Sequence, residues 1–247
     1  MKAVVRRLLP RRIRRRRILS GPLRGSTIVT SWHDYPAAIL GYTERALLAW
    51  FGECVQAGET WLDVGAHYGY TAIALSRLVG PAGRVFAFEP MLSTAGYLAQ
   101  TRGLNRLSQL TVLPFGLGAP HGDVELRALP ATRGMVDSTA TGGPPEPILV
   151  ARLDWLWPQL CGDRERVDGV KLDVQGMEIE VFRGMARLLK QFTPKLVVEV
   201  HPGVDRAEML DLLEAAGYAR RGVAIEPDER ERDTRYLDDR SYAFYRA

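Results

Sequence analysis

A glycine-containing turn between an apolar segment and a predicted helix constrains the fold of this chain more than any other feature. The run Trp61-Leu62-Asp63-Val64-Gly65-Ala66-His67-Tyr68-Gly69 places two glycines directly after strand-like residues. Glycine adopts positive φ at little cost and lets the backbone approach a ligand closely. The pattern is typical of the first strand-to-helix turn of a nucleotide-binding α/β sheet, and it predicts a ligand at that edge of the sheet.

Strand-like and helix-like segments alternate along the rest of the chain, which predicts an α/β fold with a doubly wound, mostly parallel sheet. Buried strands with short connections favour helices on both faces. We expect helices at 42–55, 71–79, 93–102, 177–192 and 206–216, and strands at 60–64, 84–88, 110–114, 124–129, 148–153, 167–172, 195–200, 218–224 and 241–246. Segments 133–147 and 226–240 are expected loops, and the first is either a lid or a plain surface insertion.

Basic residues are concentrated at the N-terminus. Nine of the 33 Lys and Arg residues lie before residue 18. The rest of the chain therefore has 24 basic and 29 acidic residues and is mildly acidic. We therefore expect a basic, disordered arm over residues 1–20 and one catalytic domain over residues 21–247. The arm over residues 2–17 is either a solvated tail or a contact for an anionic membrane surface, and nucleic acid is the less expected partner.

The sequence disfavours a membrane-spanning protein and a protein built around zinc or disulfide bonds. No segment approaches the roughly 20 apolar residues that cross a bilayer, which predicts a cytoplasmic protein, peripheral at the inner membrane surface if the arm binds lipid. Cys54 and Cys161 lie far apart in the sequence and match no metal-ligand spacing. The sequence therefore predicts no structural zinc, no disulfide framework and no bound metal.

Two acidic residues narrow the ligand class. Asp63 stands where a pyrophosphate-binding turn has its first glycine, and a carboxylate there repels a pyrophosphate but favours a cationic ligand. S-adenosylmethionine has no phosphate and carries a sulfonium and an ammonium group. Glu89 follows the strand at 84–88, where a carboxylate accepts hydrogen bonds from ribose hydroxyls. Each residue alone has a structural alternative, as a helix cap or a solvated side chain.

The chain from about residue 21 onward resembles the FkbM-type methyltransferases, a branch of the class I S-adenosylmethionine-dependent enzymes. The resemblance rests on Gly41–Glu44, Asp63–Ala66 with Gly69, Val85–Pro90, Val170–Glu178 and Glu199. It implies a Rossmann-like sheet of seven strands, S-adenosylmethionine as cofactor, and O-methylation of a sugar or natural-product hydroxyl. A small-molecule or glycan acceptor is the partner that it implies.

The sequence departs from the family pattern at two positions. His67 stands where Asn is usual and Gln175 where Glu is usual. His67 still donates and accepts hydrogen bonds, whereas Gln175 lacks the charge of a metal ligand or base. The predicted cofactor-binding residues are Asp63, Gly65, His67, Gly69, Glu89 and Phe115.

Three residues in the second half are predicted to be catalytic. His201 follows a strand end and is the candidate general base, with a loop histidine bonded to backbone as the alternative. Asp173 would orient the acceptor or the methionine moiety, or else cap the next helix. Glu178 would face the site, or else complement the dipole of the first helical turn.

Two other functions fit parts of the sequence. One is an oxidoreductase that uses a nicotinamide dinucleotide on a similar sheet, although Asp63 disfavours a pyrophosphate. The other is a non-catalytic nucleotide-binding module whose basic arm docks on a membrane or nucleic acid.

Overall fold

The structure is a computed structural model that describes residues 9–129, 146–161, 166–227 and 236–247. A seven-stranded sheet runs through its centre in the order β11-β12-β10-β9-β3-β4-β5. β12 is antiparallel to its neighbours and the remaining pairs are parallel, which confirms the predicted doubly wound, mostly parallel sheet. The bounds are β3 (Thr60–Val64), β4 (Arg84–Phe88), β5 (Leu110–Leu113), β9 (Gly169–Leu172), β10 (Lys195–Val200), β11 (Val223–Ala224) and β12 (Arg240–Phe244).

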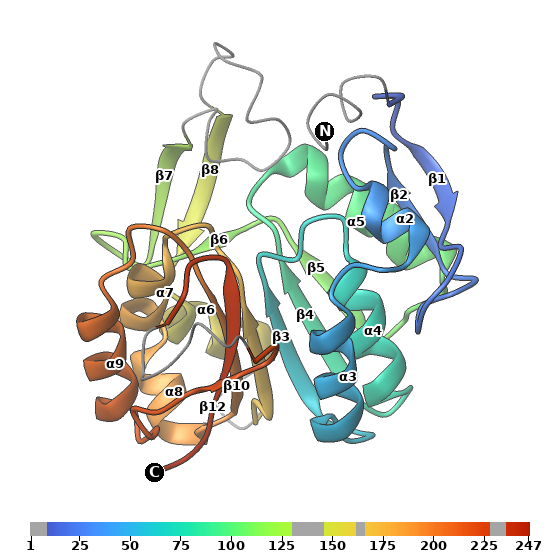
Figure 1. The fold of residues 1–247 in the computed structure, drawn as a ribbon. Helices are drawn as coiled ribbons and strands as arrows, with labels where there is room; N and C mark the ends of the chain where they lie inside the picture. Colours follow the sequence, from blue (N-terminus) through green and yellow to red (C-terminus); the bar gives the residue numbers. More distant parts are fainter. Residues whose placement is uncertain (1–8, 130–145, 162–165, 228–235) are drawn as a thin grey trace.

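Helices cover both faces of this sheet (Figure 1). One face carries α3 (Arg45–Cys54), α4 (Tyr70–Val79) and α5 (Leu92–Leu104), and the other carries α6 (Leu153–Cys161), α7 (Glu178–Gly184), α8 (Ala186–Phe192) and α9 (Arg206–Ala215). Successive side chains of β3 point to opposite faces of the sheet and enter two separate hydrophobic cores. Trp61 packs into the core on the side of α3, α4 and α5, and Leu62 and Val64 pack into the core on the side of α6 to α9. This alternation places Asp63 on the same face as Trp61.

Several predicted elements differ from the structure. The expected helix at 177–192 is divided at Met185 into α7 and α8. Gly184, the last residue of α7, packs against the Gly118 backbone, where a Cβ would lie 1.9 Å from the Gly118 oxygen. The strands expected at 124–129 and 148–153 do not join the central sheet. They form a small sheet of β6 (Gly116–Leu117), β8 (Glu146–Ala151) and β7 (Val124–Leu129), which projects at the upper left of Figure 1. Most of the segment 133–147, expected to be either a lid or a surface insertion, lies outside the described residues.

The prediction of a disordered arm over residues 1–20 is wrong for its second half. β1 (Arg14–Arg17) pairs antiparallel with β2 (Thr27–Thr30), and the following Ile18 is 1% exposed. β2 is held to α5 by a hydrogen bond from the Val29 N–H to Thr101 Oγ1 (3.0 Å), and α2 (Pro36–Leu40) follows. In the described ranges, no helix combines the length and apolar character needed to cross a membrane.

Candidate functional site

A cleft lies where β3, β4 and β9 end at the carboxyl edge of the sheet. Its volume is about 820 Å³, including the space at its open mouth. Four of the six predicted cofactor-binding residues line this cleft, namely Gly65, His67, Glu89 and Phe115, and so does Asp173. The other lining residues are mainly apolar and include Phe88, Pro90, Met91, Leu117, Ile148, Val150, Val174 and Met177. The small sheet thus contributes one wall, which the sequence did not predict.

Gly65 brings two turns of the cleft into close contact. Its φ is +79°, and a Cβ at this position would lie 1.7 Å from the Asp173 backbone oxygen. No other residue fits between the turn after β3 and the turn after β9. Gly69, with φ +91°, precedes α4 and is not part of the cleft lining; a Cβ there would meet Leu98 Cδ1 at 2.2 Å.

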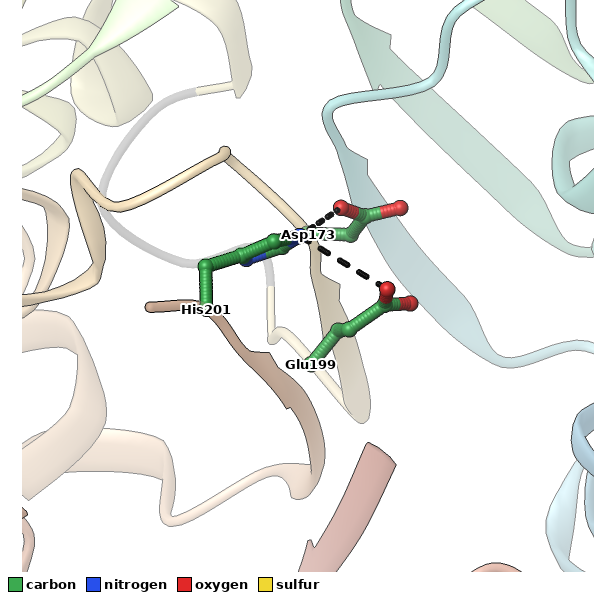
Figure 2. A group of neighbouring side chains, drawn as sticks. All are labelled: Asp173, Glu199 and His201. Atoms are coloured by element: carbon green, nitrogen blue, oxygen red, sulfur yellow. Dashed lines mark ion pairs between the residues drawn. The ribbon is translucent and has the colours of Figure 1, made fainter. Parts of the chain in front are cut away.

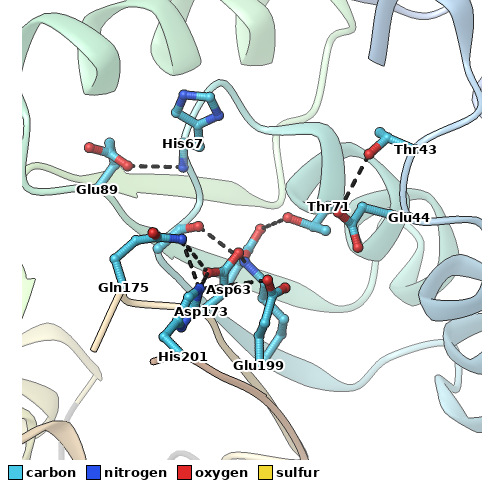
Figure 3. Close-up of polar contacts among 12 residues, drawn as sticks. Thr43, Glu44, Asp63, His67, Thr71, Glu89, Asp173, Gln175, Glu199 and His201 are labelled. Atoms are coloured by element: carbon cyan, nitrogen blue, oxygen red, sulfur yellow. Dashed lines mark hydrogen bonds and ion pairs between the residues drawn. The ribbon is translucent and has the colours of Figure 1, made fainter. Parts of the chain in front are cut away.

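Glu89 is held rigidly at the cleft wall by two backbone N–H groups. Its Oε2 accepts a hydrogen bond from the His67 N–H (2.9 Å; Figure 3). Its Oε1 accepts one from the Met91 N–H (3.0 Å). Burial raises the pKa of Glu89 to about 7, although both hydrogen bonds act in the opposite direction. Each carboxylate oxygen retains acceptor capacity for a ligand hydroxyl.

Asp63 does not line the cleft. Its side chain is fully buried, its Oδ2 accepts a hydrogen bond from Thr71 Oγ1 (2.7 Å), and its Oδ1 lies 3.3 Å from Lys171 Nζ. The charge at residue 63 therefore meets a lysine instead of facing the cleft, and the cofactor contact predicted for Asp63 stays a prediction. Lys171 Nζ also donates to the Gly65 oxygen (3.1 Å), so this ion pair supports the glycine turn from behind.

Lys171 is a central residue of the site that the sequence analysis missed. Burial lowers its pKa, but the charges of Asp173 and Asp63 outweigh burial and hold the pKa above its ordinary value. A signal was available in the sequence, because a lysine between Val170 and Leu172 in a buried strand requires an acidic partner. Its partner could not be identified before the strand order was known.

The three predicted catalytic residues lie together around His201, which is 3% exposed. Its Nδ1 lies 2.6 Å from Glu178 Oε1. Its Nε2 lies 3.4 Å from Asp173 Oδ1 and 3.6 Å from Glu199 Oε1 (Figure 2). Gln175 Nε2 lies 2.8 Å from the same Nε2. The structure does not support the helix-cap alternative for Asp173, since the residue preceding α7 is Met177 and no side chain caps that helix.

Charge and burial shift the proton affinities in this cluster. Burial lowers the pKa of His201, but the hydrogen bond to Glu178 and the charge of Asp173 raise it above its ordinary value. Burial and the charge of Asp173 raise the pKa of Glu199 to about 7. Glu199 belongs to the family pattern but not to the predicted catalytic residues, and its position beside His201 adds it to the site.

His67 and Gln175 share an unusual backbone conformation. Their φ angles are +49° and +56°, and each lies in a turn at the cleft. Asn, Asp and His are the side chains enriched in this left-handed region, so His67 suits a position where the family has Asn. Gln175 precedes Gly176, whose φ is +93°.

Comparisons with known proteins agree with this geometry. The Methyltransferase FkbM domain family matches residues 63–219. The hexuronic acid methyltransferase AglP of Haloferax volcanii is 30% identical over 169 residues, which cover 68% of this chain and 66% of AglP. The crystal structure of methyltransferase FkbM from Methylobacillus flagellatus KT is 18% identical with a TM-score of 0.51, covering 80% of this chain and 50% of that chain.

A second similar structure is precorrin-6y C5,15-methyltransferase from Geobacter metallireducens GS-15. It is 18% identical with a TM-score of 0.49, covering 82% of this chain and 88% of that chain. The chain thus spans about two thirds of the length of AglP and half that of the Methylobacillus structure. The likeness to the Methylobacillus structure agrees with the predicted Rossmann-like class I fold.

Proposed function

Since the chain belongs to the FkbM family of S-adenosylmethionine-dependent methyltransferases, we propose that it methylates a hydroxyl group of a sugar or natural product. The observation that carries this proposal is the cleft itself, in which the glycine turn and Glu89 on one side meet Asp173 on the other. The family match leaves no support for the alternatives of a dinucleotide oxidoreductase or a non-catalytic module.

The cleft lining fits a cationic cofactor without phosphates. Glu89 and Asp173 are its acidic residues, and among the described lining residues there is no Lys or Arg to bind a pyrophosphate. We propose that Gly65, His67 and Phe115 contact the cofactor and that Glu89 accepts hydrogen bonds from its ribose. When bound, S-adenosylmethionine supplies the methyl group from its sulfonium.

The acceptor end is proposed to lie at Asp173, Glu178 and His201. A hydroxyl acceptor loses its proton during methyl transfer, so this end must bind the oxygen and assist the loss of the proton. Glu178 holds the His201 ring in one orientation through the 2.6 Å contact to Nδ1. Asp173 lines the cleft and is the member of this group nearest to a bound ligand.

The acceptor class follows from charge and from the named relative. AglP is named for a hexuronic acid, which supports a carbohydrate acceptor here. The charged cluster of Asp173, Glu199 and His201 suits an acceptor that must lose a proton, which a sugar carboxylate does not, so we propose that a hydroxyl group of the sugar is methylated.

A second proposal concerns β1. Arg12, Arg14, Arg15 and Arg17 are exposed and form no ion pair with any described residue. Leu19 is 52% exposed next to this strand, and its N–H donates to the Ile39 oxygen beside the exposed Leu40. Exposed arginines with neighbouring apolar side chains suit an anionic membrane surface, and we propose that β1 docks there.

The function is tested by calorimetric titration with S-adenosylhomocysteine, followed by transfer of labelled methyl groups to neutral and acidic glycans. We expect binding of S-adenosylhomocysteine and transfer to hydroxyl groups of a sugar. A wild-type chain that fails to bind S-adenosylhomocysteine would contradict the cofactor. Alkali-labile methyl esters as the sole labelled product would contradict the hydroxyl acceptor.

A further inference from the structure

We propose that Asp173, Glu199 and His201 form a binding site for one divalent cation at the acceptor end of the cleft (Figure 2). The proposal of a cation site depends only on the positions of these three side chains. The role of that site in catalysis rests on the proposed methyl transfer. The sequence analysis predicted no metal ligands, because the two cysteines match no metal-ligand spacing.

The distances between the three side chains suit a shared ion. His201 Nε2 lies 3.4 Å from Asp173 Oδ1 and 3.6 Å from Glu199 Oε1, and the three ligand atoms lie within 4.8 Å of one another. Ligand atoms about 2.1 Å from an ion are separated by roughly 3.0 to 3.5 Å at octahedral or tetrahedral angles. The observed separations are too long for strong direct hydrogen bonds.

The histidine is prepared for such a role by Glu178. This carboxylate is fully buried, and its Oε1 lies 2.6 Å from Nδ1, which places the ring proton on Nδ1. The lone pair of Nε2 then points toward Asp173 and Glu199. Histidine ligands are commonly oriented in this way, by a carboxylate that binds the other ring nitrogen.

Gln175 offers a fourth ligand atom, its side-chain oxygen. Its amide nitrogen lies 2.8 Å from His201 Nε2 and 3.5 Å from Asp173 Oδ1. Rotating the amide by 180° places Oε1 at the same point, and the two orientations differ only in which atom is oxygen. The neutral amide is therefore compatible with a cation where the family usually has a carboxylate.

The ammonium group of Lys171 does not occupy the proposed cation site. Its Nζ is bound to the Gly65 oxygen, Asp63 Oδ1 and Asp173 Oδ2, whereas Asp173 Oδ1 faces His201. Asp63 and Glu178 are buried in this region, and Glu44, Asp173 and Glu199 are half-buried. Among the described residues, Lys171 and His201 are the buried bases beside these carboxylates. Buried excess negative charge is costly unless a cation compensates it.

Two carboxylates and one imidazole suit Mn²⁺ or Mg²⁺ better than soft cations. Because Asp173 lines the cleft, an ion held by it would face the acceptor. A divalent cation lowers the pKa of a bound hydroxyl, which is the assistance that O-methylation needs. His201 is then a ligand, and the general base predicted for it from the sequence is the competing interpretation.

The test uses the full chain after treatment with EDTA and its removal, titrated with Mn²⁺ and followed by electron paramagnetic resonance. We expect one saturable Mn²⁺ per chain, displaced by Mg²⁺, with nitrogen coupling from one histidine. Glu199→Gln and His201→Gln should each weaken binding at least tenfold, and His201→Gln should abolish the nitrogen coupling. Glu214→Gln, which removes an exposed carboxylate beside Arg220, serves as the matched control.

Absence of saturable binding by the wild-type chain would overturn the cation site, as would unchanged affinity in folded Glu199→Gln. The wild-type result decides the question even if a variant does not fold. Titration of the same samples with S-adenosylhomocysteine separates the two proposals. Cofactor binding without Mn²⁺ binding contradicts the cation site alone, and Mn²⁺ binding without cofactor binding contradicts the proposed function alone.

Discussion

Asp63 and Lys171 are paired in register on the neighbouring parallel strands β3 and β9, and their charged atoms lie 3.3 Å apart in the interior. The pair connects the turn after β3 to the turn after β9, since Lys171 Nζ also donates to the Gly65 oxygen and contacts Asp173 Oδ2. The electrostatics of the whole carboxyl edge thus depend on one buried lysine.

Lys171→Met should destabilise the protein by about 3 to 5 kcal/mol, because removal of one partner leaves Asp63 as an uncompensated buried charge. Combining it with Asp63→Asn should restore part of that loss. Urea unfolding measures both. Glu214→Gln, at an exposed ion pair with Arg220, should change the unfolding free energy by at most about 1 kcal/mol. Equal stabilities of Lys171→Met and wild type would contradict the central role of this lysine.

Glu89 should make stability depend on pH in a predictable direction. Its pKa is about 7 in the folded chain and near 4.5 when exposed, so the folded state binds this proton more tightly. Its contribution is therefore fully present below about pH 4.5 and is lost as pH rises through 7, by about 3 kcal/mol in total. The difference in unfolding free energy between wild type and Glu89→Gln, measured from pH 4.5 to 8, should show this slope. A difference that is constant with pH would refute it.

Gly65→Ala should abolish binding of S-adenosylhomocysteine and reduce stability by at least about 2 kcal/mol, because the new Cβ collides with the Asp173 backbone at a positive φ. Calorimetry and thermal unfolding measure the two effects. Gly96→Ala is the matched control, since Gly96 lies within α5 with open space around it, and it should stabilise the chain by about 0.5 to 1 kcal/mol. Wild-type cofactor affinity in Gly65→Ala would show that the contact is dispensable.

His201→Ala should reduce methyl transfer at least about 100-fold while leaving the affinity for S-adenosylhomocysteine nearly unchanged, because His201 lies outside the cleft lining. Glu178→Gln should give a smaller loss, since the amide still holds the ring but no longer fixes its proton on Nδ1. Radiolabelled transfer and calorimetry measure the two properties. Loss of cofactor affinity in both variants would instead place these residues at the cofactor.

Replacing Arg14, Arg15 and Arg17 together by Gln should weaken binding to phosphatidylglycerol vesicles and leave methyl transfer to a soluble acceptor unchanged, since all three are exposed on β1. Cosedimentation at two salt concentrations measures this, and binding of the wild type should fall at the higher one. Equal binding to phosphatidylcholine vesicles would contradict an electrostatic surface. Preferential binding to DNA over vesicles would indicate nucleic acid as the partner.

Much of the fold was predictable because its signals are local. The strands at 60–64, 84–88 and 195–200 have the predicted bounds, since each is a short apolar run ended by a polar or turn residue. β1 was missed because four consecutive arginines resemble a solvated tail. Only the pairing with β2, together with burial of the neighbouring Ile18, makes it a strand.

By itself, the sequence determined most of the strands and helices after residue 60, the glycine turn at Gly65 and the acidic residues at strand ends, because periodicity and turn chemistry act between near neighbours. Only the tertiary structure decided which charges meet. Asp63 faces Lys171 and not the cleft, and Asp173, Glu199 and His201 converge on one point. The physical reason is that strand order, and not distance along the chain, sets which buried groups compensate one another.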